Sequence, residues 1–88
     1  MFFEFDPIKS AKNKRDHGID FNEAQGIWND EKAITGSAKT VDGEDRYYRV
    51  GAIQAKLWTA IFTLRGQRIR LISVRHPHPD EQDLYDRL

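Results

Sequence analysis

The pattern of apolar and polar positions predicts a short strand at the start of the chain. Residues 2–5 are apolar and aromatic around Glu4. In an extended strand, Phe3 and Phe5 share one face and Phe2 and Glu4 the other, because successive side chains point to opposite sides. We therefore predict a first strand with one fully aromatic face.

The residues that follow predict a helix. Asp6 is a typical N-cap, Pro7 suits the first helical position, and Gly18 is the usual left-handed terminator. Its apolar stripe is thin and consists of Ile8 and Ala11. We expect this helix to lie flat on a sheet and to leave its outer face to solvent.

A second helix is predicted directly after the first. Asp20 and Glu23 have the spacing of a capping box, and the sequence NDEK at residues 29–32 ends the helix. Apolar residues recur at helical spacing and predict a buried face of Phe21, Ala24, Ile27 and Trp28.

The pattern of the second half is typical of β-strands. Residues 33–45 predict a short strand or an irregular stretch, followed by a turn at Asp42-Gly43. Gly66 can adopt the positive φ of a tight hairpin turn. Three runs rich in β-branched and aromatic residues predict a meander of strands at 46–54, 56–64 and 68–75.

The end of the chain predicts a last helix. Pro77 and Pro79 end the third strand of the meander, and Asp80 can cap a helix over residues 81–88. The predicted fold class is α+β, in one domain of residues 1–88. An antiparallel sheet, made of the N-terminal strand and the meander, carries two N-terminal helices on one face, and a short C-terminal helix completes the fold.

Composition excludes several classes of chemistry. The chain has 88 residues and no cysteine, which excludes disulfides and thiol nucleophiles and fits a reducing cytoplasm. The N-terminus is too short and too soon charged for a signal peptide, and no apolar run approaches the ~20 residues of a membrane span. We expect a cytoplasmic protein without a membrane partner.

The net charge of zero conceals a segregated charge pattern. Residues 1–45 carry six basic and ten acidic groups, and residues 76–88 carry one basic and four acidic groups. Residues 46–75 contain no acid and seven basic side chains: Arg46, Arg49, Lys56, Arg65, Arg68, Arg70 and Arg75. Either each pairs with a neighbouring carboxylate, or several share a strand surface that binds an anion such as a phosphate backbone.

The strand period brings some of these charges together. Arg68 and Arg70 share one face, while Ile69 and Leu71 point to the other, and Arg65 lies at the turn beside them. Because the helices cover one side of the sheet, we expect these arginines on the open side or at its edge.

The neighbouring strand adds an aromatic ring to this surface. Arg46 and Tyr48 share one face, and Tyr47 and Arg49 share the other. Guanidinium groups hold phosphate in a planar fork and rings stack on bases, as single-stranded nucleic acid requires. We predict roles in binding single-stranded nucleic acid for Tyr48, Arg49 and Arg65.

Three stretches of the chain resemble one protein family. They are FEFDPIKSAKNKRDHGIDFNEA, GEDRYYRVG and GQRIRLISVRHPHPDEQDLY, in this order. The matching positions include Gly43, Glu44, Arg46, Tyr47, Gly51, Ile72, Ser73, Arg75, Glu81 and Tyr85. The ordered set covers nearly the whole chain and is similar to BrnT, the ribonuclease toxin of a bacterial type II toxin–antitoxin pair.

The resemblance implies a fold, an activity and partners. It implies a RelE-like fold and an endoribonuclease that cleaves mRNA. The implied partner is a ribbon–helix–helix antitoxin that binds operator DNA, so that toxin and antitoxin form a hetero-oligomer and repress their own operon. No cofactor is implied.

RNA cleavage needs a base for the 2′-hydroxyl proton, an acid for the leaving oxygen and cations for the transition state. We predict that the cations that stabilise the transition state are Arg46, Arg68, Arg70 and Arg75.

The candidates for proton transfer come from the two ends of the chain. His17 lies at a helix C-terminus, which favours its charged form, and Lys14 precedes it by one turn. Glu81 and Tyr85 share a face of the last helix at i, i+4. Each has a structural alternative: His17 can cap its helix, and Glu81 with Tyr85 can serve to pack the last helix.

Two further possibilities are open. His76, His78 and Asp80 alternate around two prolines, but their spacing matches no zinc pattern, and we predict no metal site. The zero net charge, and a tail that is less basic than the resemblance leads us to expect, favour an alternative to the enzyme: a non-catalytic module that binds RNA or acts as the antitoxin's co-repressor.

Overall fold

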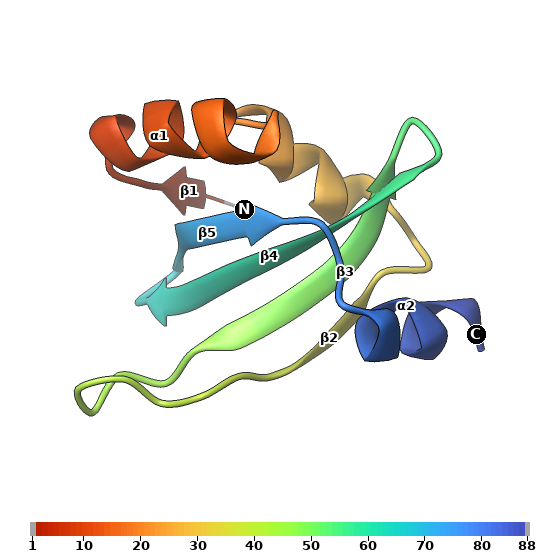
Figure 1. Ribbon diagram of the computed structural model, residues 1–88. Coiled ribbons are helices and arrows are strands. Elements are labelled where there is room, and N and C mark those ends of the chain that lie inside the picture. The colour runs from red at the N-terminus through yellow and green to blue at the C-terminus, as the bar shows by residue number, and fades with distance from the viewer. Residues whose placement is uncertain (1, 88) are drawn as a thin grey trace.

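The computed structural model describes residues 2–87 and contains one five-stranded sheet with the order β1-β5-β4-β3-β2. Its strands are β1 (Phe2–Glu4), β2 (Ile34–Ser37), β3 (Tyr47–Ile53), β4 (Lys56–Arg65) and β5 (Arg68–Arg75). Its helices are α1 (Pro7–His17), the 3₁₀ helix η1 (Glu23–Asn29) and α2 (Pro79–Asp86). In Figure 1, α1 and η1 lie above the sheet and α2 lies below it. None of the helices described is long and apolar enough to cross a membrane.

The predicted meander is confirmed, but the prediction of a purely antiparallel sheet is wrong. β2, β3, β4 and β5 pair antiparallel in sequence order. β1 instead pairs parallel with β5, with Phe2 opposite Arg68 and Glu4 opposite Arg70. The alternation of apolar and polar residues predicts the two faces of a strand but not its direction in the sheet. Two strands can pair parallel wherever the chain between them is long enough to cross over. Here the whole of α1, η1 and β2 to β4 forms that connection.

The first predicted helix is confirmed at both ends. The Asp6 carboxylate accepts a hydrogen bond from the N–H of Ile8 at 2.8 Å, and Gly18 ends α1 with φ of 85°. The prediction that Ile8 belongs to an apolar stripe facing the sheet is wrong, however, because Ile8 is 80% exposed. α1 instead buries Ser10 and Asn13.

The prediction of two N-terminal α-helices is wrong as well. The capping-box hydrogen bonds between Asp20 and Glu23 form in both directions, at 2.7 and 3.0 Å, but the helix after them is 3₁₀. The segment has only seven residues, and Gly26 lies at its centre. A helix this short forms few α-helical hydrogen bonds, and glycine disfavours the helix interior, so the α-helical form is only weakly stabilised. A Cβ at Gly26 would lie 3.3 Å from the Ile53 side chain, so η1 packs closely on β3 at this point.

The core lies between this helical layer and the sheet. Trp28 contacts Phe3 and Phe62 edge to face, with ring centroids 5.1 and 5.2 Å apart. The predicted buried face of η1 is confirmed for Ala24 and Ile27, while Trp28 is only partly buried. The buried cluster consists of Ile19, Phe21, Ala24, Ile27, Trp58, Ala60, Phe62, Ile69, Leu71 and Val74.

α2 packs on the opposite face of the sheet and begins earlier than expected. Its N-cap is His78 rather than Asp80, because the Glu81 carboxylate accepts the backbone N–H of His78 at 2.8 Å. Glu81 also accepts the hydroxyl of Thr59 at 3.0 Å and thereby ties α2 to β4. The helix covers one end of this face and leaves the other end open.

Candidate functional site

Three arginines of the β4–β5 hairpin lie on the sheet face away from α1. Arg65 and Arg68 are direct cross-strand partners, and Arg70 lies opposite Thr63 in the next position of the same face. The intervening Ile69 points the other way and is buried. The predicted alternation along β5 is therefore confirmed at this end of the strand.

A fourth arginine joins them from the neighbouring strand. Arg46 directly precedes β3 and approaches Glu44, with 3.9 Å from its Nε to the carboxylate. The same carboxylate lies 3.4 Å from Nη2 of Arg65, so Glu44 stands between the two arginines. The Nε of Arg46 is buried and has no hydrogen-bond partner in the part of the chain that the structure describes. We call the surface formed by Arg46, Arg65, Arg68 and Arg70 the arginine face.

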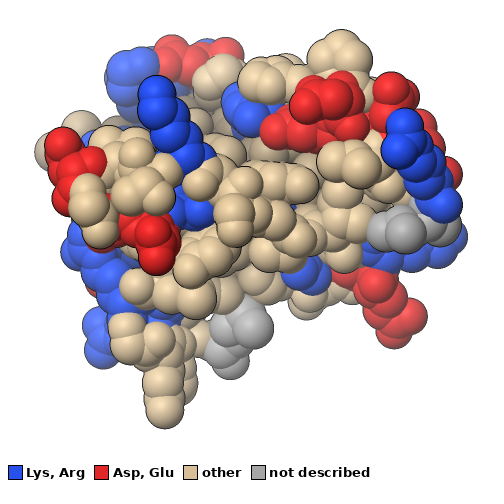
Figure 2. All heavy atoms as spheres, turned by 90° about the horizontal axis from the view of Figure 1, so that it is seen from below, with Lys and Arg blue, Asp and Glu red and all other residues tan. Residues whose placement is uncertain are grey.

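The arginine face keeps an excess of positive charge. Glu44 is the ion-pair partner of both Arg46 and Arg65, and the carboxylate of Glu4 lies 3.5 Å from Arg70. Arg68 has no ion pair among residues 2–87. Figure 2 shows the molecule from below, where basic and acidic side chains lie intermixed at the left and at the right of a middle covered by other residues. Like charges directly across a strand pair repel, so a bound anion would relieve the repulsion between Arg65 and Arg68.

Aromatic rings lie beside the arginine face. Tyr48 shares its side of the sheet, and the ring lies so close over Gly36 that a Cβ there would approach the Tyr48 hydroxyl to 2.5 Å. Phe2, the register partner of Arg68, is 68% exposed. Rings next to guanidinium groups are the usual means of holding single-stranded bases.

Arg49 lies apart from the other arginines. It pairs with Ala60 of the core side of β4, and its guanidinium carbon lies 5.5 Å from the centroid of the Trp28 ring. It donates a hydrogen bond to the hydroxyl of Thr35 at 2.8 Å. The structure therefore places Arg49 on the helical side of the sheet, away from Arg46 and Tyr48.

Arg75 and Glu81 form a two-pronged ion pair at the other end of β5. The two guanidinium nitrogens of Arg75 lie 2.8 and 3.0 Å from the two carboxylate oxygens. Burial disfavours the charged form of Glu81, but hydrogen bonds from Arg75, from the His78 N–H and from Thr59 outweigh it. They lower the pKa of Glu81 to about 2. Glu81 is thus a carboxylate at neutral pH with its oxygens already occupied.

Tyr85 does not contact Glu81 but binds a different carboxylate. Its hydroxyl donates to Asp30 at 2.7 Å, and Asp30 also accepts the backbone N–H of Ala52 at 2.8 Å. The hydrogen bond to Asp30, with burial, raises the pKa of Tyr85 above its usual value. Glu81 and Tyr85 therefore anchor α2 at two separate points.

His17 and Lys14 line different hollows along α1. Lys14 donates to Glu23 at 2.7 Å, and this hydrogen bond raises the pKa of Lys14, which keeps its ammonium charged at neutral pH. It lines a hollow with Phe5 and Arg15. His17 instead lines a hollow of about 250 Å³ that opens toward β5 and includes Ser73.

Within the described residues, no three His, Asp or Glu side chains come together as a metal site. His76 stacks on Trp58, with ring centroids 4.7 Å apart, and so has a packing partner.

Three residues that lie at or near the arginine face and the hollow of His17 have no role predicted from the sequence. Phe2 reaches Arg68 only through the parallel pairing of β1, which alternation could not predict. Lys9 and Ser73 line the hollow of His17. The four-residue spacing of Lys9, Asn13 and His17, which places them on one side of α1, was the signal for this groove.

Fold and surface together describe a small α+β protein that presents clustered guanidinium groups on an open sheet. The family model described as "Ribonuclease toxin, BrnT, of type II toxin-antitoxin system" matches residues 5–81, and the chain belongs to this family. Its family is one of ribonuclease toxins that are paired with an antitoxin. A search of curated proteins finds no match.

Proposed function

We propose that the chain is an endoribonuclease that cleaves single-stranded mRNA on the arginine face and so inhibits translation and growth. The observation that carries this proposal is the convergence of four arginines on one open sheet surface, where their ion-pair partners among residues 2–87 are two carboxylates, Glu44 and Glu4. Clustered guanidinium groups bind phosphate and stabilise the charge that develops on it in the transition state. Action on mRNA places the protein in the cytoplasm.

The proposed reaction uses the RNA's own 2′-hydroxyl as the nucleophile. Its oxygen forms a bond to the adjacent phosphorus while the bond from phosphorus to the 5′-oxygen breaks. A base accepts the 2′-hydroxyl proton and an acid protonates the leaving 5′-oxygen, which leaves a 2′,3′-cyclic phosphate and a 5′-hydroxyl. Arg46, Arg68 and Arg70 neutralise the phosphorane-like transition state, while Arg65, Tyr48 and Phe2 hold the strand.

For proton transfer we propose His17, because it lines a hollow that it shares with Ser73 on the open side of β5. Lys14 is held as an ammonium by Glu23 and can contribute charge but not accept a proton. Glu81 and Tyr85 act by fixing α2, and through it Arg75, at the border of the substrate surface.

The antitoxin is proposed to be a ribbon–helix–helix protein that neutralises the toxin on the same surface. An acidic or amphipathic segment of the antitoxin would compete with RNA for the arginine face. Operator DNA would then be bound through the antitoxin alone, within a hetero-oligomer of toxin and antitoxin.

The test is induction of the chain alone in bacteria. The proposal expects that growth stops, that transcripts are cut with 5′-hydroxyl ends, and that co-expression of the antitoxin restores growth. Unchanged growth and intact transcripts, with the protein folded and abundant, would refute it.

One observation supports a second candidate, a module that binds RNA or the antitoxin without catalysis. Of the proton-transfer candidates, Glu81 and Lys14 are both held in charged states that do not exchange protons at neutral pH. A chain that binds RNA and antitoxin but cuts no transcript would establish this function.

A further inference from the structure

A groove runs along the free edge of β5, between this strand and α1. β1 covers β5 only as far as Arg70, so within residues 2–87 the rest of β5 has no neighbouring strand on that side. The register of β4 and β5 shifts at Ile61 and Phe62, which leaves Ile72 as an extra residue at this point. The resulting hollow of about 250 Å³ is lined by Lys9, Lys12, Asn13, Asp16, His17, Ile72 and Ser73.

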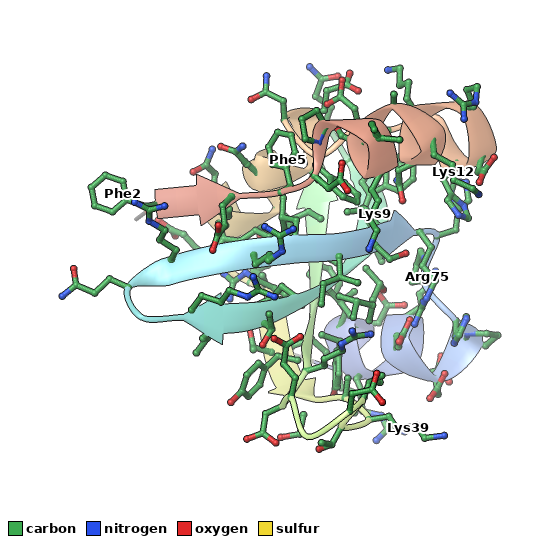
Figure 3. The ribbon with its side chains drawn as sticks, turned by 90° about the vertical axis from the view of Figure 1, so that its left-hand side faces the viewer. Phe2, Phe5, Lys9, Lys12, Lys39 and Arg75 are labelled. Carbon is green, nitrogen blue, oxygen red and sulfur yellow. The ribbon has the colours of Figure 1, made fainter. Side chains whose placement is uncertain are left out.

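The groove contains one cation without a partner. Lys12 is paired with Asp16 one turn along the helix. Lys9 forms no ion pair or side-chain hydrogen bond in the described part of the chain, and Figure 3 shows it extending from α1 toward β5. Asn13 is bound to Val74 and Ile19 and so closes the floor of the groove. The net charge of this lining is positive, since Asp16 offsets only Lys12.

The groove is continuous with the arginine face along β5. Ser73 pairs with Ile61 on the open side of the sheet, the same side as Arg70. Two residues of strand, Leu71 and Ile72, lie between them, so the distance along the strand is three residue steps or roughly 10 Å. A strand of RNA that left Arg70 along β5 would therefore pass Ser73, which lines the same hollow as Lys9.

We propose that the groove between α1 and the free edge of β5 is a second phosphate site for the same RNA strand, with the Lys9 ammonium and the Ser73 hydroxyl as its ligands. The inference rests on the proposed function, because it assumes that the RNA backbone lies on the arginine face. It specifies the path of the bound RNA: the RNA strand leaves the arginine face along β5 toward α1, rather than across β3.

The test compares two RNA lengths on the full-length chain. Single-stranded 2′-O-methyl RNAs of about 2 and about 12 nucleotides are bound without being cleaved, and the shorter one, with one internucleotide phosphate, is too short to bridge the arginine face and the groove. We expect Lys9→Ala to weaken binding of the longer RNA by about fivefold, to reduce the slope of log affinity against log salt by about 0.7, and to leave the shorter RNA unaffected. Ser73→Ala should weaken the longer RNA in the same selective way.

The matched control is Arg15→Ala, which removes one exposed positive charge from the other side of the same helix. It should change neither affinity, and the melting temperature of all variants should be that of the parent chain. Equal effects of Lys9→Ala on both RNAs, or no effect on either, would overturn the second site. So would a Lys9-dependent response to inorganic phosphate alone, with long-RNA affinity unchanged, because the groove would then take free phosphate.

The same measurement separates this inference from the function on which it rests. If Arg68→Ala with Arg70→Ala abolishes binding of both RNAs and Lys9→Ala changes neither, only the groove is refuted. If the arginine variant binds both RNAs as the parent does, the arginine face and the groove are refuted together.

Discussion

Asn13 hydrogen-bonds to both the N–H and the C=O of Val74, at 3.1 and 2.8 Å, and so stands in for a neighbouring strand at the edge of β5. Its amide nitrogen also donates to the C=O of Ile19 at 2.8 Å. β1 is too short to cover this part of β5, and an open edge would leave polar backbone groups unpaired beneath α1. One side chain thereby joins α1, the following loop and the sheet.

Asn13→Ala should destabilise the protein by about 2–4 kcal/mol, because it leaves a buried N–H and two carbonyls without partners. Urea denaturation measures the free energy of unfolding, and hydrogen exchange should lose protection at the amide of Val74 in particular. Asn22→Ala is the control, since the side chain of Asn22 is exposed and makes no capping hydrogen bond at the start of η1. Equal stabilities of the two variants would contradict this role of Asn13.

Glu81→Gln should loosen α2 from the sheet. The substitution keeps the shape of the side chain but leaves the partly buried guanidinium of Arg75 without its counter-charge, which costs about 2–3 kcal/mol. We expect a loss of about 2–3 kcal/mol in urea, accompanied by faster hydrogen exchange in α2. Asp83→Asn, a charge change at an exposed position of the same helix, should stay within about 0.5 kcal/mol of the parent.

The lowered pKa of Glu81 also predicts acid sensitivity. Its pKa is about 2 in the folded protein against 4.5 ordinarily, so its contribution is complete above pH 4.5 and is lost as the pH falls toward 2. The difference corresponds to about 3 kcal/mol, and the lowered pKa of Asp30 acts in the same direction. The free energy of unfolding, measured between pH 5 and pH 2, should fall more steeply for the parent than for Glu81→Gln. Parallel curves would show that Glu81 is not the group responsible.

Gly36→Ala should displace the ring of Tyr48 and weaken RNA binding. The added Cβ would approach the ring to 2.5–2.6 Å, so the ring must move away from its place on the sheet. If Tyr48 stacks on a base, affinity for single-stranded RNA should fall by about tenfold, as it should for Tyr48→Ala. Ser37→Ala, at the neighbouring position on the other face of β2, is the control and should bind RNA like the parent. Unchanged affinity in both Gly36→Ala and Tyr48→Ala would remove Tyr48 from the binding surface.

The local elements of the fold could largely be predicted from the sequence. Asp6, Gly18 and Gly66 mark a helix start, a helix end and a hairpin turn by their backbone preferences alone, and all three act as expected. The direction of β1 could not be predicted, because it depends on which sheet edge remains free after the meander has formed. Nor could the 3₁₀ geometry of η1, since the same apolar spacing serves both kinds of helix.

Some residues of the candidate site could likewise be placed from the sequence and others could not. Arg65, Arg68 and Arg70 follow from the period of one hairpin and lie together as predicted. Arg49 could not be placed in the same way. Alternation put Arg49 and Arg46 on different faces of the sheet, but it could not tell which of the two faces the helices cover. The partners of Glu81 and Tyr85 come from β5, β4 and the loop after η1, which are distant in sequence, and only the assembled fold brings them together.

The most direct test of the central claim, that the arginine face cleaves RNA, is the cleavage rate of a single-stranded RNA by purified chain carrying Arg68→Ala and Arg70→Ala. Removal of two cations from a phosphate transition state should lower the rate at least about 100-fold. The charge-matched pair Arg15→Ala with Lys32→Ala should cleave at the parent rate. A folded Arg68→Ala, Arg70→Ala protein that cleaves as fast as the parent would contradict the claim.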